Sequence, residues 1–388
     1  MKYYLAGGAV RNLFLGGKPQ DLDYVFTGTE ENFLALNPGA RKLGRNAIYM
    51  LGGHEYTPLG EGIEANLLAR DFTVNAFLLG EDGVLHMHPE ALSDLQAKRL
   101  NPASPAGFSL DPLRVFRAAR FCSVFPDFKP GAACLDLMAE AAARETFIRI
   151  SAERVGQECL KALKAPRPGN FLRVLERGRA LRYWFKELSG SGRVPAGPPE
   201  YHNSSVLEHL AQIMDRAARE FSVWLALRPD ITARKAEELV QATVWMALCH
   251  DLGKASTPGD MLPHHYQHEI RGIQAAAALA SRLRLPARLR GAGALAAKLH
   301  MKAGMYRRLR PSTRVDVLTE AQAKGLLEPL FLLAQADSGL SGLLELAGTE
   351  LKRILEVRLP PHWENLGEKS GLHLRELRCS ALSRSSGE

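Results

Sequence analysis

Two glycines and two aspartates near the start of the chain have the types and spacing of a phosphate-binding site. Gly7 and Gly8 follow the apolar run 3–6 and precede a short helical segment. Glycine lets a backbone approach its ligand, and the amides at a helix N-terminus attract an anion. Asp21 and Asp23 lie two residues apart on a predicted strand, so they point to one face. There the two carboxylates can hold one or two Mg²⁺ ions against a bound phosphate.

Further along the chain, an arginine and an aspartate lie at the mouth of another predicted strand. Arg70 and Asp71 belong to the segment LLARDFTVNAFLL, residues 67–79. Next to a carboxylate metal site, such a pair can bind triphosphate oxygens and ribose hydroxyls. The same pair also fits a surface salt bridge at the start of a strand.

A third group of charged residues recurs at intervals of three in LDPLRVFRAARF, residues 110–121. On a helix, Asp111, Arg114, Arg117 and Arg120 would share one face. An aspartate accepts and an arginine donates a hydrogen bond, which matches cytosine or adenine, whereas uracil and guanine reverse the pattern. Arg117 and Arg120 then remain available for phosphates. The spacing equally fits the basic face of an amphipathic helix.

Histidines concentrate in the second half of the chain around a His-Asp pair. His250 and Asp251 lie in ALCHDLGK, with His209 upstream and Asp337 downstream, all on predicted helices. This mixed nitrogen and oxygen set suits Mn²⁺, Ni²⁺, Fe²⁺ or Mg²⁺. A metal held there can activate a water molecule to attack a phosphate. Lys254 either meets a substrate phosphate or is solvated.

The remaining histidines of this region have less specific roles. Three of them can add metal ligands or phosphate contacts: His265, His268 and His300. We expect His202 and His264 in loops.

Composition agrees with a soluble enzyme that has a polyanionic partner. The chain has 388 residues and a net charge of +8, and its pI is about 9.3, which favours nucleic acid. The five cysteines are scattered without a CxxC pair, as in a cytosolic protein with reduced thiols. We find no secretion signal and no apolar run long enough to span a membrane. A cytoplasmic location follows, with no obligatory protein partner indicated.

Hydrophobic periodicity predicts a multidomain fold. Short strand-like runs mixed with a few helices predict an α/β or α+β head over residues 1–97. The runs are YYLAGG, LDYVF, NAIYML, FTVNAFLL and GVLHM. Helical spacing then predicts an all-α neck and body over 98–190 and an all-α domain over 200–345. A tail occupies 346–388.

Taken in order, the first three motifs resemble a known family. GGAVRNLFLGGKPQDLD resembles the nucleotidyltransferase signature of the DNA polymerase β superfamily, and more closely the class II bacterial CCA-adding tRNA nucleotidyltransferases and their poly(A) polymerase relatives. The resemblance implies Mg²⁺ on Asp21 and Asp23, and base selection by Asp111 and Arg114. It implies phosphate or nucleotide contacts for Gly7, Gly8, Arg11, Arg70, Asp71, Arg117 and Arg120. The implied partners are tRNA, CTP and ATP.

Some positions depart from the family pattern. Asn12, Ala69 and Leu110 stand where the family has Asp, Arg and Glu. Only 46 residues, 24–69, separate Asp23 from Arg70, where the family usually has a longer flexible loop that switches the pocket from CTP to ATP. The activity expected is therefore CCA addition, with a CC-adding enzyme or a polyadenylating relative as alternatives.

The histidine motif resembles a second family. His209, His250–Asp251 and Asp337 in this order resemble the HD phosphohydrolase superfamily. Some bacterial CCA-adding enzymes carry such a domain, which implies phosphatase and 2′,3′-cyclic phosphodiesterase activity here. A rival hypothesis is a phosphohydrolase whose head is a degenerate RNA-binding module. Intact Asp21, Asp23, Asp111 and Arg114 argue against it.

Overall fold

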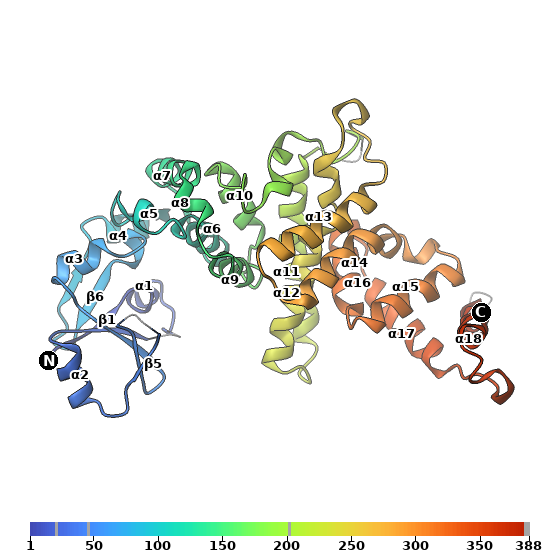
Figure 1. Ribbon diagram of the computed structural model, residues 1–388, viewed down its shortest axis with the longest axis horizontal. Coiled ribbons are helices and arrows are strands. Elements are labelled where there is room, and N and C mark those ends of the chain that lie inside the picture. Colours follow the sequence, from blue (N-terminus) through green and yellow to red (C-terminus); the bar gives the residue numbers. More distant parts are fainter. Residues whose placement is uncertain (20–21, 45–46, 201–202, 384–388) are drawn as a thin grey trace. The chain divides into compact units, whose positions relative to one another are not determined.

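The chain forms two compact units. A computed structural model describes residues 1–19, 22–44, 47–200 and 203–383, and Figure 1 traces them. The first unit comprises Met1–Cys122, Asp127–Ile150 and Arg177–Ala180, and the second comprises Ser123–Pro126, Ser151–Glu176 and Leu181–Glu388. The finer division predicted at 97, 190 and 345 stays a prediction.

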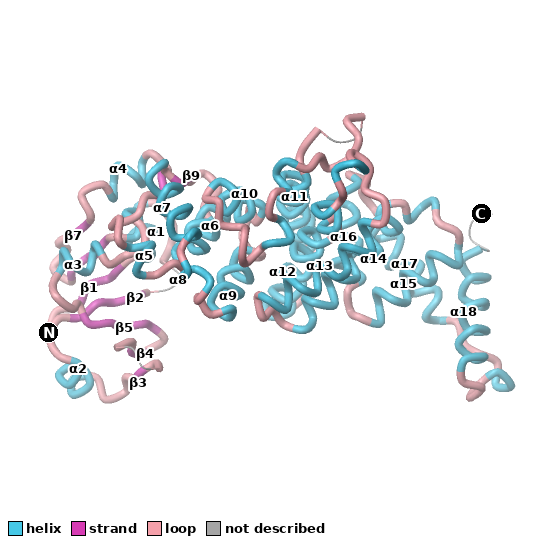
Figure 2. The backbone as a smooth tube through the Cα atoms, turned by 45° about the horizontal axis from the view of Figure 1, so that its top comes forward, coloured by secondary structure: helices cyan, strands magenta, loops and turns pink. Residues whose placement is uncertain are grey.

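All strands of the described residues lie in the first unit (Figure 2). Seven of them form one mixed sheet in the order β3-β4-β5-β2-β1-β6-β7. They are β1 (Tyr3–Ala6), β2 (Asp23–Phe26), β3 (Arg41–Lys42), β4 (Tyr49–Leu51), β5 (His54–Pro58), β6 (Phe77–Gly80) and β7 (Leu85–Met87). A separate pair joins β8 (Arg99–Leu100) to β9 (Lys129–Pro130).

The predicted strand-like runs are confirmed in β1, β2, β4, β6 and β7. Strand β5 was not predicted, because its sequence HEYTP lacks a clear alternation of apolar and polar residues. It runs parallel to β2, whereas β1 is antiparallel to both β2 and β6. Strand β1 thus lies between the strand that carries Asp23 and the strand that follows Arg70.

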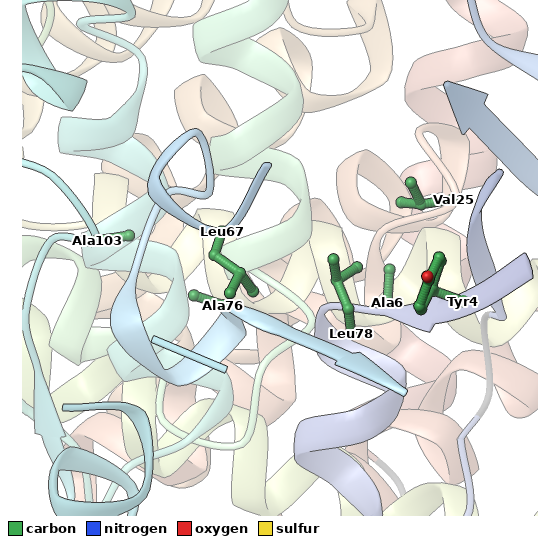
Figure 3. Packing of buried hydrophobic residues seen from close by; sticks show 7 residues of the cluster. All are labelled: Tyr4, Ala6, Val25, Leu67, Ala76, Leu78 and Ala103. Carbon is green, nitrogen blue, oxygen red and sulfur yellow. The ribbon is translucent and has the colours of Figure 1, made fainter. Parts of the chain in front are cut away.

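Alternation of side chains gives the sheet two apolar faces. One face buries Tyr4 and Ala6 of β1 with Leu78 of β6 (Figure 3). The other carries Leu5 and Phe77 against Val10 of helix α1. Burying a large apolar side chain contributes roughly 1.5–3 kcal/mol. Packing on both faces therefore fixes the strand ends that present the polar motifs.

Short helices complete the first unit. They are α1 (Gly8–Phe14), α2 (Glu30–Leu36), α3 (Ile63–Leu68), α4 (Ala91–Gln96), α5 (Gly107–Leu110), α6 (Arg114–Val124), α7 (Ala132–Ala143) and α8 (Glu145–Ile148). Helix α6 begins in this unit and ends in the second. The helix predicted after Gly8 is confirmed as α1.

The second unit is helical in its described residues. Its helices are α9 (Ala152–Ala162), α10 (Gly169–Arg177), α11 (Val206–Ala226), α12 (Ala233–Cys249), α13 (His268–Arg282), α14 (Ala287–Gly304), α15 (Pro311–Ala323), α16 (Leu327–Ser338), α17 (Leu343–Glu356) and α18 (Glu368–Ser383). The C-terminal residue of α10 is grouped with the first unit. Helix α12 is central, because α11, α14 and α16 all pack against it. Its residues 241–249 are buried without interruption.

The cysteines of the described residues are free thiols, and most of them are buried. No disulfide joins the cysteines of the described chain. Burial raises the pKa of the thiols of Cys122, Cys134 and Cys159 to about 12, so these thiols stay protonated near neutral pH. Within the described ranges, no helix is both long and apolar enough to cross a bilayer.

A close backbone contact in the second unit gives a first testable prediction. A Cβ at Gly253 would lie 2.0 Å from the carbonyl oxygen of His268 and 2.6 Å from the amide nitrogen of Gly272. Because both atoms are backbone, Gly253→Ala should lower the free energy of unfolding by about 1–3 kcal/mol. At Gly259 an added Cβ meets nothing within 4 Å, so Gly259→Ala is the control. Equal denaturation midpoints for the two variants would contradict the prediction.

Candidate active sites

The Gly7–Gly8 turn lies beside two arginines. Gly7 has φ +66° and its amide donates to the carbonyl of Phe77 at 3.0 Å. A Cβ at Gly7 would lie 3.5 Å from Nη1 of Arg70, and a Cβ at Gly8 would lie 3.3 Å from Nη2 of Arg11. A side chain at Gly7 would make an ordinary contact with Arg70, so glycine is favoured there by its positive φ, whereas a side chain at Gly8 would press against Arg11. The structure brings together four of the residues that the sequence selected.

Arg11 belongs to a buried polar network. Only 8% of its surface is exposed. Its Nε and Nη2 donate to Oδ1 of Asn12 at 3.2 and 2.9 Å, and its Nη1 donates to Oδ1 of Asn75. Burial lowers the pKa of Arg11 to about 10, although the carboxylate of Asp71 opposes the shift.

Asp71 connects this network to helix α6. Its Oδ1 accepts from the Asn75 amide and from the backbone of Phe72, both at 2.9 Å. Its Oδ2 lies 2.8 Å from Nη2 of Arg117. Asp71 is 7% exposed, so the predicted alternative of a surface salt bridge with Arg70 is wrong. Sequence reasoning missed Asn75, which stands in the TVNA segment directly after the Arg70–Asp71 motif.

Positive charge accumulates around the buried carboxylate of Asp71. Burial lowers the pKa of Arg70 and of Arg114, while Asp71 opposes both shifts. The charge of Arg120 adds to the lowering of the Arg11 pKa. The buried Nε of Arg117 has no hydrogen-bond acceptor among the described residues. Such a cluster favours an anionic ligand.

Of the two predicted metal carboxylates, Asp23 belongs to the described residues. Asp23 begins β2, where it pairs with Ala6 of β1 and Glu55 of β5. Asp23 is exposed. Burial lowers the pKa of Arg70, and the negative charge of Asp23 opposes that shift to a smaller extent. Asp21 lies outside the described residues. The shared face of the two aspartates therefore stays a prediction.

The prediction that Asp111 lies on the helix with Arg114 is wrong. Helix α6 begins at Arg114, and Asp111 has extended backbone with φ −135° and ψ 92°. Pro112 accounts for this, because proline disfavours the helical conformation of the residue before it. Asp111 instead precedes the helix, and its Oδ1 accepts from the Leu113 amide at 3.3 Å.

The arginines of the third motif do share helix α6, as predicted, but they have different partners. Arg114 donates from Nη1 to the carbonyl of Arg70 at 2.9 Å and from Nη2 to the carbonyl of Ala69 at 2.6 Å. A Cβ at Gly107 would lie 2.1 Å from Nη1 of Arg114. Because Gly107 has no side chain, Arg114 has room to reach the backbone carbonyls of Ala69 and Arg70.

In the second unit, several helices direct histidines and aspartates to one point. His209 comes from α11, His250 and Asp251 follow α12, His268 begins α13, His300 lies on α14 and Asp337 lies on α16. We call these six residues the HD cluster. Oδ2 of Asp251 lies 3.2 Å from Nε2 of His209 and 3.3 Å from Nε2 of His250. Oδ1 of Asp337 lies 3.5 and 3.8 Å from the same nitrogens. The structure therefore assembles all four predicted metal ligands.

The other oxygen of Asp251 faces a second pair of histidines. Oδ1 lies 3.2 Å from Nε2 of His268 and 3.3 Å from Nε2 of His300, yet it accepts no well-formed hydrogen bond within the described chain. Two triads that share Asp251 could each hold an ion: His209, His250, Asp251 and Asp251, His268, His300. His268 and His300, which the sequence gave only general roles, thus belong to the cluster.

Backbone carbonyls fix the ring orientation in three of these histidines. Nδ1 lies 2.8 Å from the Ala247 carbonyl in His250, 2.8 Å from the His265 carbonyl in His268, and 3.0 Å from the Ala296 carbonyl in His300. A carbonyl only accepts, so Nδ1 carries the proton. In a neutral ring, Nε2 then offers its lone pair toward the cluster, as in metal-binding histidines. This donor chemistry fits a divalent transition metal.

Neighbouring residues support the HD cluster. The ammonium of Lys254 lies 2.8 Å from Oδ2 of Asp251 and 3.0 Å from the carbonyl of Ala196, so the alternative of a solvated lysine is wrong. His265 does not join the cluster directly, because its ring bonds Thr257 and the carbonyl of Pro195. His264 lies in an exposed loop as predicted, and His202 lies outside the described residues.

Comparison with known proteins places the chain in a family. No protein-family model matches. The chain is 32% identical over 370 residues to the multifunctional CCA protein of Mannheimia succiniciproducens, which covers 87% of this chain and 84% of that protein. It is 33% identical over 359 residues to that of Aromatoleum aromaticum, covering 87% and 83%.

Solved structures show the same fold. A CCA-adding enzyme in complex with ATP has a TM-score of 0.66 at 18% identity, covering 98% of this chain and 86% of that one. The Thermotoga maritima CCA-adding enzyme complexed with tRNA has a TM-score of 0.59 at 18% identity, covering 99% and 91%. With more than 30% identity across most of both sequences, the chain belongs to the family of multifunctional CCA proteins.

Proposed function

We propose that this protein is a tRNA nucleotidyltransferase that adds C and then A to the tRNA 3′ end. It takes CTP and ATP as substrates and uses no nucleic-acid template. The observation that carries the proposal is the similarity to multifunctional CCA proteins over 87% of the chain. The solved neighbours with bound ATP, CTP or tRNA have the same fold. The net charge of +8 supports an RNA partner.

The arginine cluster of the first unit is the proposed triphosphate site. Arg11 and Arg70 lie against Gly7 and Gly8, and the buried carboxylate of Asp71 pairs with Arg117. The excess of positive charge attracts the phosphates, and the side chain of Arg117 is 39% exposed, so a ligand can approach its guanidinium group. Hydrogen bonds to charged groups contribute about 1.5–3 kcal/mol.

Asp21 and Asp23 are the proposed Mg²⁺ ligands of this site. Carboxylate oxygens are the ligands that Mg²⁺ prefers, and Asp23 is exposed at the start of β2. Mg²⁺ held there would make the tRNA 3′-hydroxyl easier to deprotonate and would neutralise charge on the triphosphate. The two aspartates hold the ion, and the arginines orient the triphosphate.

The loss of a metal carboxylate tests the transferase. Asp23→Ala or Asp21→Ala should abolish nucleotide addition to tRNA lacking its 3′ end, because the metal loses half of its ligand pair. The measurement is incorporation of labelled CTP and ATP, supplied separately, on a sequencing gel. Glu31→Ala removes an exposed carboxylate on α2 and is the control.

The gel also distinguishes the alternatives. Normal addition by Asp23→Ala would contradict the proposed site. Incorporation of C without A by the unaltered protein would identify a CC-adding enzyme. The interval between β2 and Arg70 would favour a CC-adding enzyme. Most of it is occupied by α2, β3, β4, β5 and α3, so little of it is left for a flexible loop. Incorporation of A alone would identify an adenylating relative.

Base selection is proposed for Asp111 and Arg114. The backbone carbonyls of Ala69 and Arg70 take two of the five N–H donors of Arg114, which holds the plane of the guanidinium and leaves donors for a base. Asp111 supplies an acceptor directly before the helix. An acceptor beside a donor matches cytosine and adenine.

Two substitutions test this base selection by different routes. Asp111→Ala removes the acceptor, whereas Gly107→Ala pushes Arg114 from its position. Each should reduce discrimination against UTP and GTP by ~5- to 150-fold, the equivalent of one hydrogen-bond mismatch, with less effect on triphosphate affinity. The measurement is kcat/KM for the four nucleotides. Unchanged selectivity in both variants would show that other residues choose the base.

A second activity is proposed for the HD cluster, namely hydrolysis of phosphate monoesters and 2′,3′-cyclic phosphates. The supporting observation is that four imidazole Nε2 atoms lie 3.2–3.3 Å from the oxygens of Asp251. A divalent metal bound there supplies an activated water and neutralises phosphate charge. The positive charge of Lys254, which lies 2.8 Å from Asp251, would attract the anion toward the cluster.

Removal of the shared ligands tests the hydrolase. His250→Ala with Asp251→Ala should abolish metal-dependent hydrolysis of 2′,3′-cyclic AMP, because both triads lose Asp251. Hydrolysis is measured with Mn²⁺, Ni²⁺ or Mg²⁺ after treatment with a chelator. CTP incorporation by the same variant should be retained, since the transferase residues lie in the other unit. Continued hydrolysis by the double variant would reject the HD cluster as the catalytic site.

A further inference from the structure

The HD cluster lies at a cavity that is larger than a phosphate needs. The cavity has a volume of about 400 Å³, which falls in the range of pockets for ligands of nucleotide size. His209, Asp251, His268 and His300 contribute to its lining on one side. The loop residues 263–267 line it as well, together with Ala196–Pro198.

Two aromatic rings of this loop are exposed beside the metal-binding residues. Tyr266 is 66% exposed, and His264 is exposed as well. Their ring centroids lie 5.8 Å apart with an interplanar angle of 20°, so the rings are nearly parallel. Exposed aromatic faces of this kind can stack on a flat ligand.

The backbone under these rings is held by side-chain hydrogen bonds. Nη1 of Arg271 donates to the carbonyl of Tyr266 at 2.7 Å, and Nη2 of Arg271 donates to Oγ1 of Thr257 at 3.0 Å. Nε2 of His265 donates to the carbonyl of Pro195 at 2.9 Å, and its Nδ1 accepts from Thr257 at 2.8 Å. The ring pair is therefore exposed on a fixed support, and little order has to be gained on binding.

We propose that His264 and Tyr266 form a stacking platform for the base of a nucleoside phosphate whose phosphate group faces Asp251. The inference rests on the proposed hydrolase and specifies its substrate class. An aromatic platform accepts every base, because each has a flat π-face. The site should therefore prefer nucleotides over phosphate esters without a base, and should discriminate little among bases.

The test compares two cyclic esters that share the reacting group. 2′,3′-Cyclic AMP carries a base, and glycerol 1,2-cyclic phosphate does not. Tyr266→Ala should lower kcat/KM for 2′,3′-cyclic AMP by roughly 5- to 20-fold, the lower part of the range for base stacking, mainly through KM. Hydrolysis of the glycerol ester should be unchanged. Tyr266→Phe keeps the ring and should retain activity on both.

Controls separate the possible results. Tyr183→Ala removes an exposed tyrosine of the same unit that does not line this cavity, and it should alter neither reaction. An equal loss on both esters, or no loss on either, in Tyr266→Ala would overturn the platform and leave the hydrolase intact. Failure of the unaltered protein to hydrolyse either ester would reject the hydrolase and the platform together.

Discussion

A buried carboxylate needs partners, and each of the two candidate sites contains one. Asp71 is 7% exposed and Asp251 is 3% exposed. Removing a charged carboxylate from water costs several kcal/mol unless cations or hydrogen bonds compensate for it. Asp71 is compensated by Arg117, the Asn75 amide and the Phe72 backbone. Asp251 is compensated by the ammonium of Lys254. These contacts fix the partners of each carboxylate in place, so the neighbouring side chains that would contact a ligand are ordered as well.

The charges and hydrogen-bonding groups of the two candidate sites are not fully compensated by the protein, and a bound ligand would complete the compensation. In the first unit, several arginines surround one buried carboxylate, and a buried N–H of Arg117 has no acceptor in the described part of the chain. In the second unit, Oδ1 of Asp251 is near two imidazoles without a well-formed hydrogen bond. The arginine cluster thus has an excess of positive charge, and the HD cluster has converging lone pairs that a cation would satisfy. The same constraint therefore favours a triphosphate in one unit and a metal in the other.

Periodicity predicted much of the fold, and residue types together with the two family resemblances selected most of the residues that come together. Strand alternation located five strands, and intervals of three on α6 placed Arg114, Arg117 and Arg120 correctly. The errors have local causes. Asp111 was predicted on that helix because its spacing fits the arginines, although Pro112 disfavours a helical conformation at Asp111. The roles of Asn75 and Lys254 depend on contacts between residues that no periodicity encodes. His268 and His300 needed the tertiary arrangement of α13 and α14.

The three departures from the family pattern change the side chains at Asn12, Ala69 and Leu110. The contacts that hold Arg11 and Arg114 remain. Asn12 accepts two hydrogen bonds from Arg11, but its neutral amide does not add the negative charge that an aspartate would place there. Ala69 lacks a guanidinium, yet its carbonyl anchors Arg114. Leu110 is 81% exposed at the end of α5, so its side chain adds little to the packing. These contacts give no support to a head reduced to RNA binding, because the scaffold that orients Arg11, Asp71 and Arg114 is complete without the missing side chains.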